Sequence, residues 1–427
     1  MINPKVSSFL YIFFLTGIIC FGLFLRTGYY LHPEPLWWDE TLLNYVINCD
    51  SYFDLFKNYE FIMVAPPLFM TAVKFVSDMF DNSTFAVRFF PYLFGCLSLI
   101  LFLPFIRKIF KNKLPVAICM SMFALNPMLI YYSKEFRHYS VDVFFFLLII
   151  LCYDKFKVNS FKNIILSSIA VFLLPFCSFG SIVAVFSVLI FKFFTVEKKQ
   201  KIKYLFLFAS LFIALLLLII IFKDSYSDKT SWSIWNECFI KLSLNSFIKV
   251  NFLFIKYIGY NCVLAFILFL SGIIVSFFRK NTYCILLLIS ICLCYCASFL
   301  KIYPFSERAI LFLIPAFFVF IVYLFKISED NKLVVIKNII LSVVTLFAVY
   351  PGFLYNADNI GDKIFSIVEH NIKIKDMRAF NTCEVLNIIN RYNEDTDILL
   401  SSEEMYNFAL YYNSFYKKGK KIRSEER

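Results

Sequence analysis

The chain has 427 residues, of which 60% are hydrophobic and only 17% are charged, and its formal net charge is +12. This composition excludes a water-soluble globular protein, because so much apolar surface cannot all be buried in one core. Only helices and closed barrels satisfy the backbone in lipid, and the apolar runs here are continuous rather than alternating, which favours helices. The basic residues lie in short loops between these runs, so the lipid bilayer explains the charge and no nucleic-acid partner is expected.

Residues 1–350 contain eleven apolar spans, each near the ~20 residues with which a helix crosses the hydrocarbon layer. They run over 9–25, 91–106, 114–131, 140–153, 163–178, 180–194, 204–222, 258–278, 283–300, 309–325 and 333–350. One helix over 163–194 would be twice too long, so we divide that stretch at Pro175 and at Ser178-Phe179-Gly180-Ser181. The prediction for 1–350 is an all-α, multi-pass transmembrane domain.

Lysine and arginine orient these spans. They are concentrated in five alternate loops, which include Arg107-Lys108 and 198–203. Basic loops stay in the cytoplasm, so we predict a cytoplasmic N-terminus and, after eleven crossings, an extracytoplasmic C-terminus. The opposite loop 223–257 departs from this rule, because it holds five lysines.

Two segments are expected outside the bilayer on the extracytoplasmic side. The first is the loop 26–90, which is too long for a simple connector. Within it, 40–49 and 67–80 carry apolar residues at helical spacing and predict juxtamembrane amphipathic helices. The second is the polar tail 351–427, for which we predict a small α/β segment. Its expected elements are helices over 378–392 and 403–415 and a short strand over 397–401.

An acidic pair follows the first span, in Leu36-Trp37-Trp38-Asp39-Glu40. Asp39 is a candidate catalytic base, because a carboxylate at the lipid–water boundary can accept a proton from an attacking hydroxyl. The alternative is that Asp39 only caps the helix that starts near Glu40. On that helix Glu40 would point about 100° away, so the two catalytic candidates are not expected to share one role.

Two arginines at span ends, Arg137 and Arg308, are candidates for binding an anion on the same membrane face as Asp39. Arg137 lies in Tyr132-Ser133-Lys134-Glu135-Phe136-Arg137-His138-Tyr139, and Arg308 lies in Tyr303-Pro304-Phe305-Ser306-Glu307-Arg308. A guanidinium keeps its charge and binds phosphate oxygens bidentately. The alternative is a snorkelling arginine, or an ion pair with Glu135 or Glu307. Arg88, before the second span, is a weaker candidate of the same kind.

We expect no metal site. His138 is one of three histidines, and no second histidine accompanies it at ligand spacing. The 13 cysteines lie mostly in apolar spans and are interpreted as small hydrophobic residues.

A lipid that carries a sugar through a phosphate fits these residues. The phosphate leaves, so cationic donors must meet its developing charge, and a base must stand on the opposite side of the anomeric carbon. That geometry inverts the anomeric centre in one displacement. No glycine-rich nucleotide loop is present among only ten glycines, which an activated lipid donor would explain.

The sequence resembles the bacterial membrane glycosyltransferases of family 39, relatives of the dolichyl-phosphate-mannose–protein mannosyltransferases and of the aminoarabinose lipid A transferases. The likeness rests on motifs in order along most of the chain: Trp37-Trp38-Asp39-Glu40, Ala65-Pro66-Pro67-Leu68-Phe69, Ala86-Val87-Arg88-Phe89, Tyr132 to Tyr139, Tyr303 to Arg308 with Pro315, Val385-Leu386, Asp395 to Leu399 and Tyr411-Tyr412.

The resemblance implies a GT-C fold in the bacterial cytoplasmic membrane, an outward-facing active site, and a polyprenyl-phosphate sugar as donor. It implies that Asp39 is the acidic loop residue and Arg137 the arginine of the second outer loop, with Glu135, His138 and Tyr139 in the same donor-binding motif. Acceptors consistent with it are a glycan, a lipid or a protein. No cofactor is expected; some GT-C enzymes need a divalent metal, but no ligand cluster here calls for one. Aminoarabinose transferases carry a lysine where Val64 and Ala65 stand, which argues against that sugar.

Two other functions stay open. A flippase or transporter for lipid-linked glycans predicts ionisable residues near the bilayer midplane and broken helices, whereas the charges here lie at span ends. A glycan polymerase or ligase uses the same leaving group, so the sequence does not separate it from a transferase of single sugars.

Overall fold

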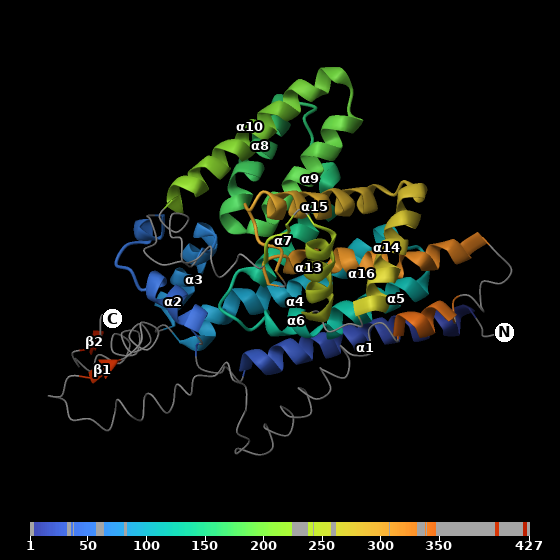
Figure 1. The fold of residues 1–427 in the computed structure, drawn as a ribbon, viewed down its shortest axis with the longest axis horizontal. Coiled ribbons are helices and arrows are strands. Elements are labelled where there is room, and N and C mark those ends of the chain that lie inside the picture. Colours follow the sequence, from blue (N-terminus) through green and yellow to red (C-terminus); the bar gives the residue numbers. More distant parts are fainter. Residues whose placement is uncertain are drawn as a thin grey trace, which may run out of the picture.

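The computed structural model describes residues 4–31, 36, 38–56, 64–80, 83–223, 238–241, 243–257, 262–306, 308–330, 338, 340–346, 398–400 and 422–424. It is almost entirely helical, and its helices form an elongated bundle (Figure 1). The α-helices are α1 (Pro4–Leu31), α2 (Trp38–Ile47), α3 (Pro67–Met79), α4 (Thr84–Ile109), α5 (Lys113–Leu125), α6 (Pro127–Tyr131), α7 (Tyr139–Leu151), α8 (Phe161–Cys177), α9 (Phe179–Thr195), α10 (Lys198–Ile221), α13 (Leu244–Tyr257), α14 (Cys262–Arg279), α15 (Thr282–Phe299) and α16 (Ile314–Val322). Shorter 3₁₀ segments are η1 (Tyr52–Phe56), η2 (Tyr153–Lys155), η4 (Leu311–Leu313) and η5 (Tyr323–Asp330).

Four helices in the described part of the chain are long and apolar enough to cross a membrane: Ser8–Gly28, Thr84–Ile109, Lys198–Ile221 and Thr282–Phe299. Six shorter apolar helices accompany them, at Lys113–Leu125, Tyr139–Leu151, Phe161–Cys177, Phe179–Thr195, Val263–Arg279 and Leu311–Lys326. Together they fall on the first ten predicted spans. Only 338 and 340–346 of the eleventh are described, so the number of eleven crossings stays a prediction.

The outer surface of the bundle is apolar. Large hydrophobic side chains are exposed on α1, α8, α10 and α14, among them Phe13, Phe161, Phe206 and Phe277. A water-soluble protein does not expose apolar surface on this scale, so these faces are suited to lipid.

Two helix junctions have clear local causes. As predicted, a break divides 163–194, but it falls at Ser178 and not at Pro175, which lies inside α8. α8 ends at Cys177, and the Ser178 hydroxyl accepts a hydrogen bond from the Ser181 amide at the start of α9 (3.2 Å). The predicted single span 114–131 is wrong, because the chain breaks at Asn126, whose side chain caps α6 through the Leu129 amide (3.1 Å). Pro127 cannot continue α5.

Arg26 provides hydrogen bonds for backbone carbonyl oxygens at the C-terminal end of α5, where this break interrupts the helix. Its guanidinium, buried in α1, donates hydrogen bonds to the carbonyl oxygens of Ala124 (3.1 Å) and Phe123 (3.4 Å). A cation at a helix C-terminus also complements the helix dipole. The arginine is therefore a structural group within the bundle.

A further helix was not predicted. α13 lies within 223–257, which was predicted to be an extramembrane loop. The Asn251 side chain of α13 accepts a hydrogen bond from the Tyr295 hydroxyl of α15 (2.5 Å), which ties it to the bundle.

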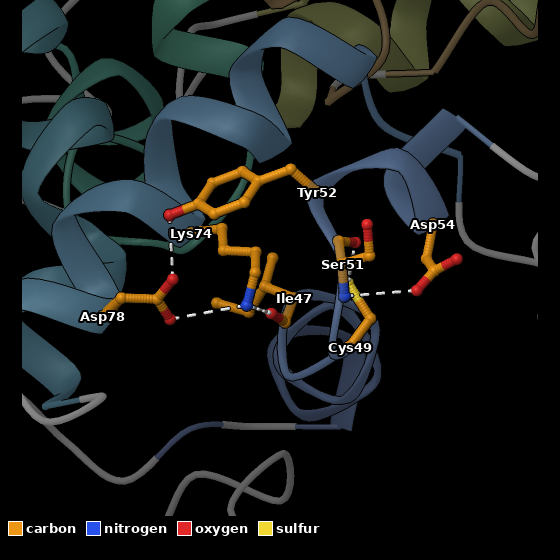
Figure 2. Close-up of polar contacts among 7 residues, drawn as sticks. All are labelled: Ile47, Cys49, Ser51, Tyr52, Asp54, Lys74 and Asp78. Carbon is orange, nitrogen blue, oxygen red and sulfur yellow. Dashed lines mark hydrogen bonds and ion pairs between the residues drawn. The ribbon is translucent and has the colours of Figure 1, made fainter.

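The two amphipathic helices predicted within 26–90 are present as α2 and α3, together at one end of the bundle (Figure 1). Figure 2 shows the contact that joins them: the Lys74 ammonium of α3 donates to the Ile47 carbonyl oxygen at the end of α2 (3.0 Å). Within α3, Lys74 also donates to Asp78 (3.4 Å). The Tyr52 hydroxyl of η1 also donates to Asp78 (2.8 Å). An apolar core that includes Leu43, Ile47, Met70 and Val73 lies between α2 and α3. We call α2, η1 and α3 the outer-loop unit.

The tail contributes two short strands. β1 (Ile398–Leu400) pairs in parallel with β2 (Ile422–Ser424), with Ile398 opposite Ile422. β1 coincides with the predicted strand 397–401. The predicted helices 378–392 and 403–415 lie outside the described residues, so the α/β character of this segment stays a prediction.

Candidate active site

Asp39 lies in the first turn of α2, where three distant parts of the chain meet. Its Oδ2 accepts a hydrogen bond from Nη1 of Arg308 (2.8 Å) and forms an ion pair with Nη2 of Arg137 (2.7 Å). Arg308 is 269 residues away in sequence. Both contacts are made to Oδ2, so neither of them uses Oδ1. The structure thus brings the predicted base and both predicted anion-binding arginines together.

Arg137 is carried by the turn between α6 and α7. We call residues 132–138 the arginine loop. The Ser140 hydroxyl donates to the Tyr132 carbonyl oxygen (2.8 Å), and the Asp142 amide donates to the His138 carbonyl oxygen (2.9 Å), so the start of α7 holds both ends of this loop. The Arg137 side chain is buried, which strengthens its electrostatic interactions relative to those in water.

Arg308 is the more exposed of the two arginines that contact Asp39: 25% of its side chain is exposed, against 4% for Arg137. It lies in the connection between α15 and η4. The Tyr303 hydroxyl donates to the Ala309 carbonyl oxygen (2.7 Å), and the Ile310 amide donates to the Ser306 carbonyl oxygen (3.1 Å). These bonds fold the connection into a compact turn that directs the guanidinium to Asp39.

Glu40 and Arg88, also predicted to belong to the site, form a buried pair with each other. The Glu40 carboxylate is fully buried and accepts hydrogen bonds from Nε (2.8 Å) and Nη2 of Arg88. It also accepts a hydrogen bond from the Phe136 amide of the arginine loop. A carboxylate and a guanidinium that satisfy each other in a buried pair are poorly placed for catalysis or for binding phosphate. As predicted, Asp39 and Glu40 point in different directions: Asp39 contacts Arg137 and Arg308, and Glu40 contacts Arg88.

Glu135 is buried in the arginine loop and does not form the alternative ion pair predicted for Arg137. Burial, and next the negative charge of Glu40, raise the pKa of Glu135 to about 8. Its carboxyl group is therefore mostly protonated at neutral pH. A protonated carboxyl carries no negative charge, so it does not neutralise an arginine.

His138 and Tyr139 complete the predicted motif. Burial, and next the charge of Arg137, lower the pKa of His138 to about 3, so the imidazole is neutral. Its Nε2 lies 3.6 Å from Asp142, which is too far for a hydrogen bond. The Tyr139 ring packs on the His138 ring (centroids 4.9 Å apart) and lies near the charges of Asp39, Arg137 and Arg308. In the described part of the chain, no three histidine, cysteine or acidic residues form a group that would hold a metal ion.

Sequence reasoning missed two groups near this site. One is the backbone amide of Phe136, which carries no signal in sequence. The other is Asp142 in the first turn of α7. Its carboxylate accepts a hydrogen bond from the Ser178 hydroxyl (2.6 Å) and from backbone amides at the start of α9. It therefore caps α9 from a neighbouring helix.

No family model matches the sequence, and no curated protein matches it. Among solved structures, the chain is similar to the archaeal oligosaccharyltransferase AglB from Archaeoglobus fulgidus, determined in complex with an inhibitory peptide and a dolichol-phosphate. The two share a TM-score of 0.52 and 14% sequence identity, over 83% of this chain and 56% of the AglB chain. The membrane-type helical bundle of this chain therefore shares its fold with AglB.

The helical fold and the apolar helices indicate a multi-pass membrane protein. The chain spans little more than half of the length of AglB, and at 14% identity the likeness concerns the fold. The chemistry of this chain therefore depends on the residues of its own site.

Proposed function

We propose that this protein is a membrane glycosyltransferase of the family 39 type. It moves a sugar from a polyprenyl-phosphate donor to a hydroxyl acceptor on a glycan, a lipid or a protein. The observation that carries the proposal is the meeting of Asp39 with Arg137 and Arg308. A carboxylate between two guanidinium groups, at the end of a membrane bundle, is suited to a reaction in which a lipid-linked phosphate leaves.

The proposed reaction is a single inverting displacement. The acceptor hydroxyl loses its proton to Asp39, and its oxygen attacks the anomeric carbon of the sugar. The bond from that carbon to the phosphate oxygen breaks, and the electron pair leaves with the phosphate. Arg137 and Arg308 stabilise the charge on the leaving phosphate. Each guanidinium has five N–H donors, so it can hold Asp39 with one group and a phosphate oxygen with another.

The neighbours of this triad have supporting roles in the proposal. Tyr139 and neutral His138 line the donor site beside the arginines, where a neutral ring adds no charge that would oppose the phosphate. Glu135, buried and mostly protonated at neutral pH, adds little negative charge beside Arg137. The site faces the extracytoplasmic side of a bacterial cytoplasmic membrane, with the N-terminus of the chain in the cytoplasm.

A second candidate function is transfer of a preassembled glycan. The observation that favours it is the fold similarity to AglB, an oligosaccharyltransferase determined with a dolichol-phosphate and a peptide. The same Asp39 and arginine chemistry serves both functions, because the leaving group in both is a lipid-linked phosphate. The mass of the product distinguishes them: one added sugar or several.

The test uses purified protein in liposomes with polyprenyl-phosphate sugars and with cell-envelope glycans or hydroxyl-containing peptides as acceptors. We expect turnover by the wild type, an inverted anomeric centre in the product, and a fall in kcat of about 10²–10⁴-fold for Asp39→Asn. Asp78→Asn is the matched control, because it removes an exposed carboxylate of the outer-loop unit. Equal turnover by Asp39→Asn would remove Asp39 as the base, and no turnover with any donor would reject the transferase.

A further inference from the structure

Two consecutive residues of α2 contact two consecutive residues of the arginine loop. Asp39 pairs with the Arg137 side chain (2.7 Å), and Glu40 accepts a hydrogen bond from the backbone amide of Phe136. We propose that Glu40 is a positioning residue that fixes the register of the arginine loop against α2, so that Arg137 meets Asp39. The proposal rests on the proposed function for the roles of Asp39 and Arg137, but the Glu40 contact can be measured without any activity.

The ion pair between Asp39 and Arg137 fixes the end of the arginine side chain but not the backbone from which it starts. An arginine side chain has several rotatable bonds, and ordering it costs up to about 2 kcal/mol of conformational entropy. A hydrogen bond to the backbone one residue earlier fixes the chain from which that side chain starts. Because Asp39 and Glu40 point in different directions from one rigid helix, the two contacts together define the position of the loop.

Phe136 is anchored on both its backbone and its side chain. Its ring is fully buried in the apolar core of the outer-loop unit, near Phe69 (centroids 6.3 Å apart) and together with Val87 of α4. This apolar contact stabilises the packing of the arginine loop against the outer-loop unit, but it does not fix the exact position of the loop. The hydrogen bond from the Phe136 amide to Glu40 fixes that position, because hydrogen bonds depend on distance and angle.

Arg88 compensates the buried negative charge of Glu40. Glu40 is completely buried, and an unpaired charge there would cost several kcal/mol of desolvation. Arg88, itself buried in α4, neutralises it through Nε and Nη2 and orients its oxygens. The pair thus joins α2, α4 and the arginine loop at one point.

The experiment separates the hydrogen-bond acceptor from the charge. The variant Glu40→Gln/Arg88→Met removes both charges but leaves an amide oxygen that can accept from Phe136. The variant Glu40→Leu/Arg88→Met removes both charges and the acceptor. Replacing a buried ion pair by uncharged residues is often neutral for stability, so both variants should fold. Thermal unfolding checks this, and Glu40→Ala/Arg88→Met repeats the comparison if the leucine cannot be packed.

Hydrogen exchange of peptides covering 132–140 is the readout that does not depend on activity. We expect faster exchange in the leucine variant than in the glutamine variant, and about 10-fold or more lower kcat/KM for the donor, at equal unfolding temperatures. Equal exchange in the two variants would overturn the proposal. If the wild type transfers no sugar from any donor, the proposed function fails, while the exchange comparison still decides whether Glu40 fixes the loop.

Discussion

Asp39 and Glu40 are neighbours in sequence and chemically alike, yet their environments separate them. Asp39 contacts one guanidinium that is buried and one that is a quarter exposed, so its ion pairs are partly accessible to a substrate. Glu40 is enclosed with Arg88, and removing one partner of such a buried pair typically costs about 3–5 kcal/mol. The carboxylate with a partly exposed partner is suited to chemistry, and the carboxylate enclosed with a buried partner is suited to a structural role.

The protonation of Glu135 gives a prediction at this scale. Its pKa is about 8 in the folded protein and near 4.5 in the unfolded chain, so the folded protein binds the proton more tightly. This contribution to stability is fully present below pH 4.5 and is lost as the pH rises through 8. We expect wild type to lose thermal stability across that range relative to Glu135→Gln, which cannot titrate.

Thermal unfolding in detergent at a series of pH values measures this difference. His138 titrates in both proteins, so its contribution cancels in the comparison. Asp78→Asn, which removes an exposed carboxylate, should follow wild type. Parallel curves for wild type and Glu135→Gln would contradict the raised pKa of Glu135.

The outer-loop unit places Asp39, and its helix α2 is held at both ends. The N-terminus of α2 is fixed by the Asp39 and Glu40 contacts. Its C-terminus is fixed by Lys74 of α3, whose ammonium reaches the Ile47 carbonyl oxygen (Figure 2). A cation at that end also complements the helix dipole.

For the α2–α3 contact we expect Lys74→Met to destabilise the unit by about 1–3 kcal/mol, because it leaves the Ile47 carbonyl oxygen without this donor. Hydrogen exchange should quicken in peptides covering α2. Tyr52→Phe, which removes only the exposed hydrogen bond to Asp78, is the control and should change stability by less than about 1 kcal/mol. Equal effects of the two substitutions would contradict the importance of Lys74.

The close approach of α4 to the arginine loop requires a glycine. A Cβ at Gly95 would lie 2.6 Å from the Cβ of Ser133, so Gly95→Ala would displace the start of the loop. We expect a loss of about 1–3 kcal/mol in stability and reduced transferase activity. Gly17→Ala in α1 is the matched control: nothing lies within 4 Å of its added Cβ, and alanine favours a helix. Equal stability and activity of the two variants would contradict this packing.

At the scale of the whole molecule, the site requires one orientation in the membrane. Asp39, Arg137 and Arg308 lie together, so the three loops that carry them must be on one side of the bilayer. The basic residues around 198–203 are predicted to lie on the other side, in the cytoplasm.

Cysteine labelling tests this topology. In a background without the native cysteines, we expect Asn48→Cys in the outer-loop unit to react with a membrane-impermeant maleimide in intact cells. Lys199→Cys should react only after permeabilisation. The reverse pattern would place the candidate site in the cytoplasm and reject a donor presented at the outer face.

The features that follow from local pattern were predictable from sequence. Runs of apolar residues mark the spans, Ser178 and Gly180 mark the break before α9, and apolar spacing marks α2 and α3. Asp39, Arg137 and Arg308 stood out because charges are rare in this chain. α13 was missed because its lysines make the segment resemble a loop in sequence. The break at Asn126 was missed because the short interruption Asn126-Pro127 hardly lowers the hydropathy of its span.

What a residue does with its charge was decided only by the tertiary structure. The amino-acid sequence determined which segments enter lipid and which carry charge, because hydropathy and helix periodicity act over a few neighbouring residues. It did not determine that Arg308 reaches Asp39, that Arg88 and the Phe136 amide engage Glu40, or that Glu135 keeps its proton. Ion pairs, hydrogen bonds and pKa values depend on distance and burial, and only the folded chain sets those.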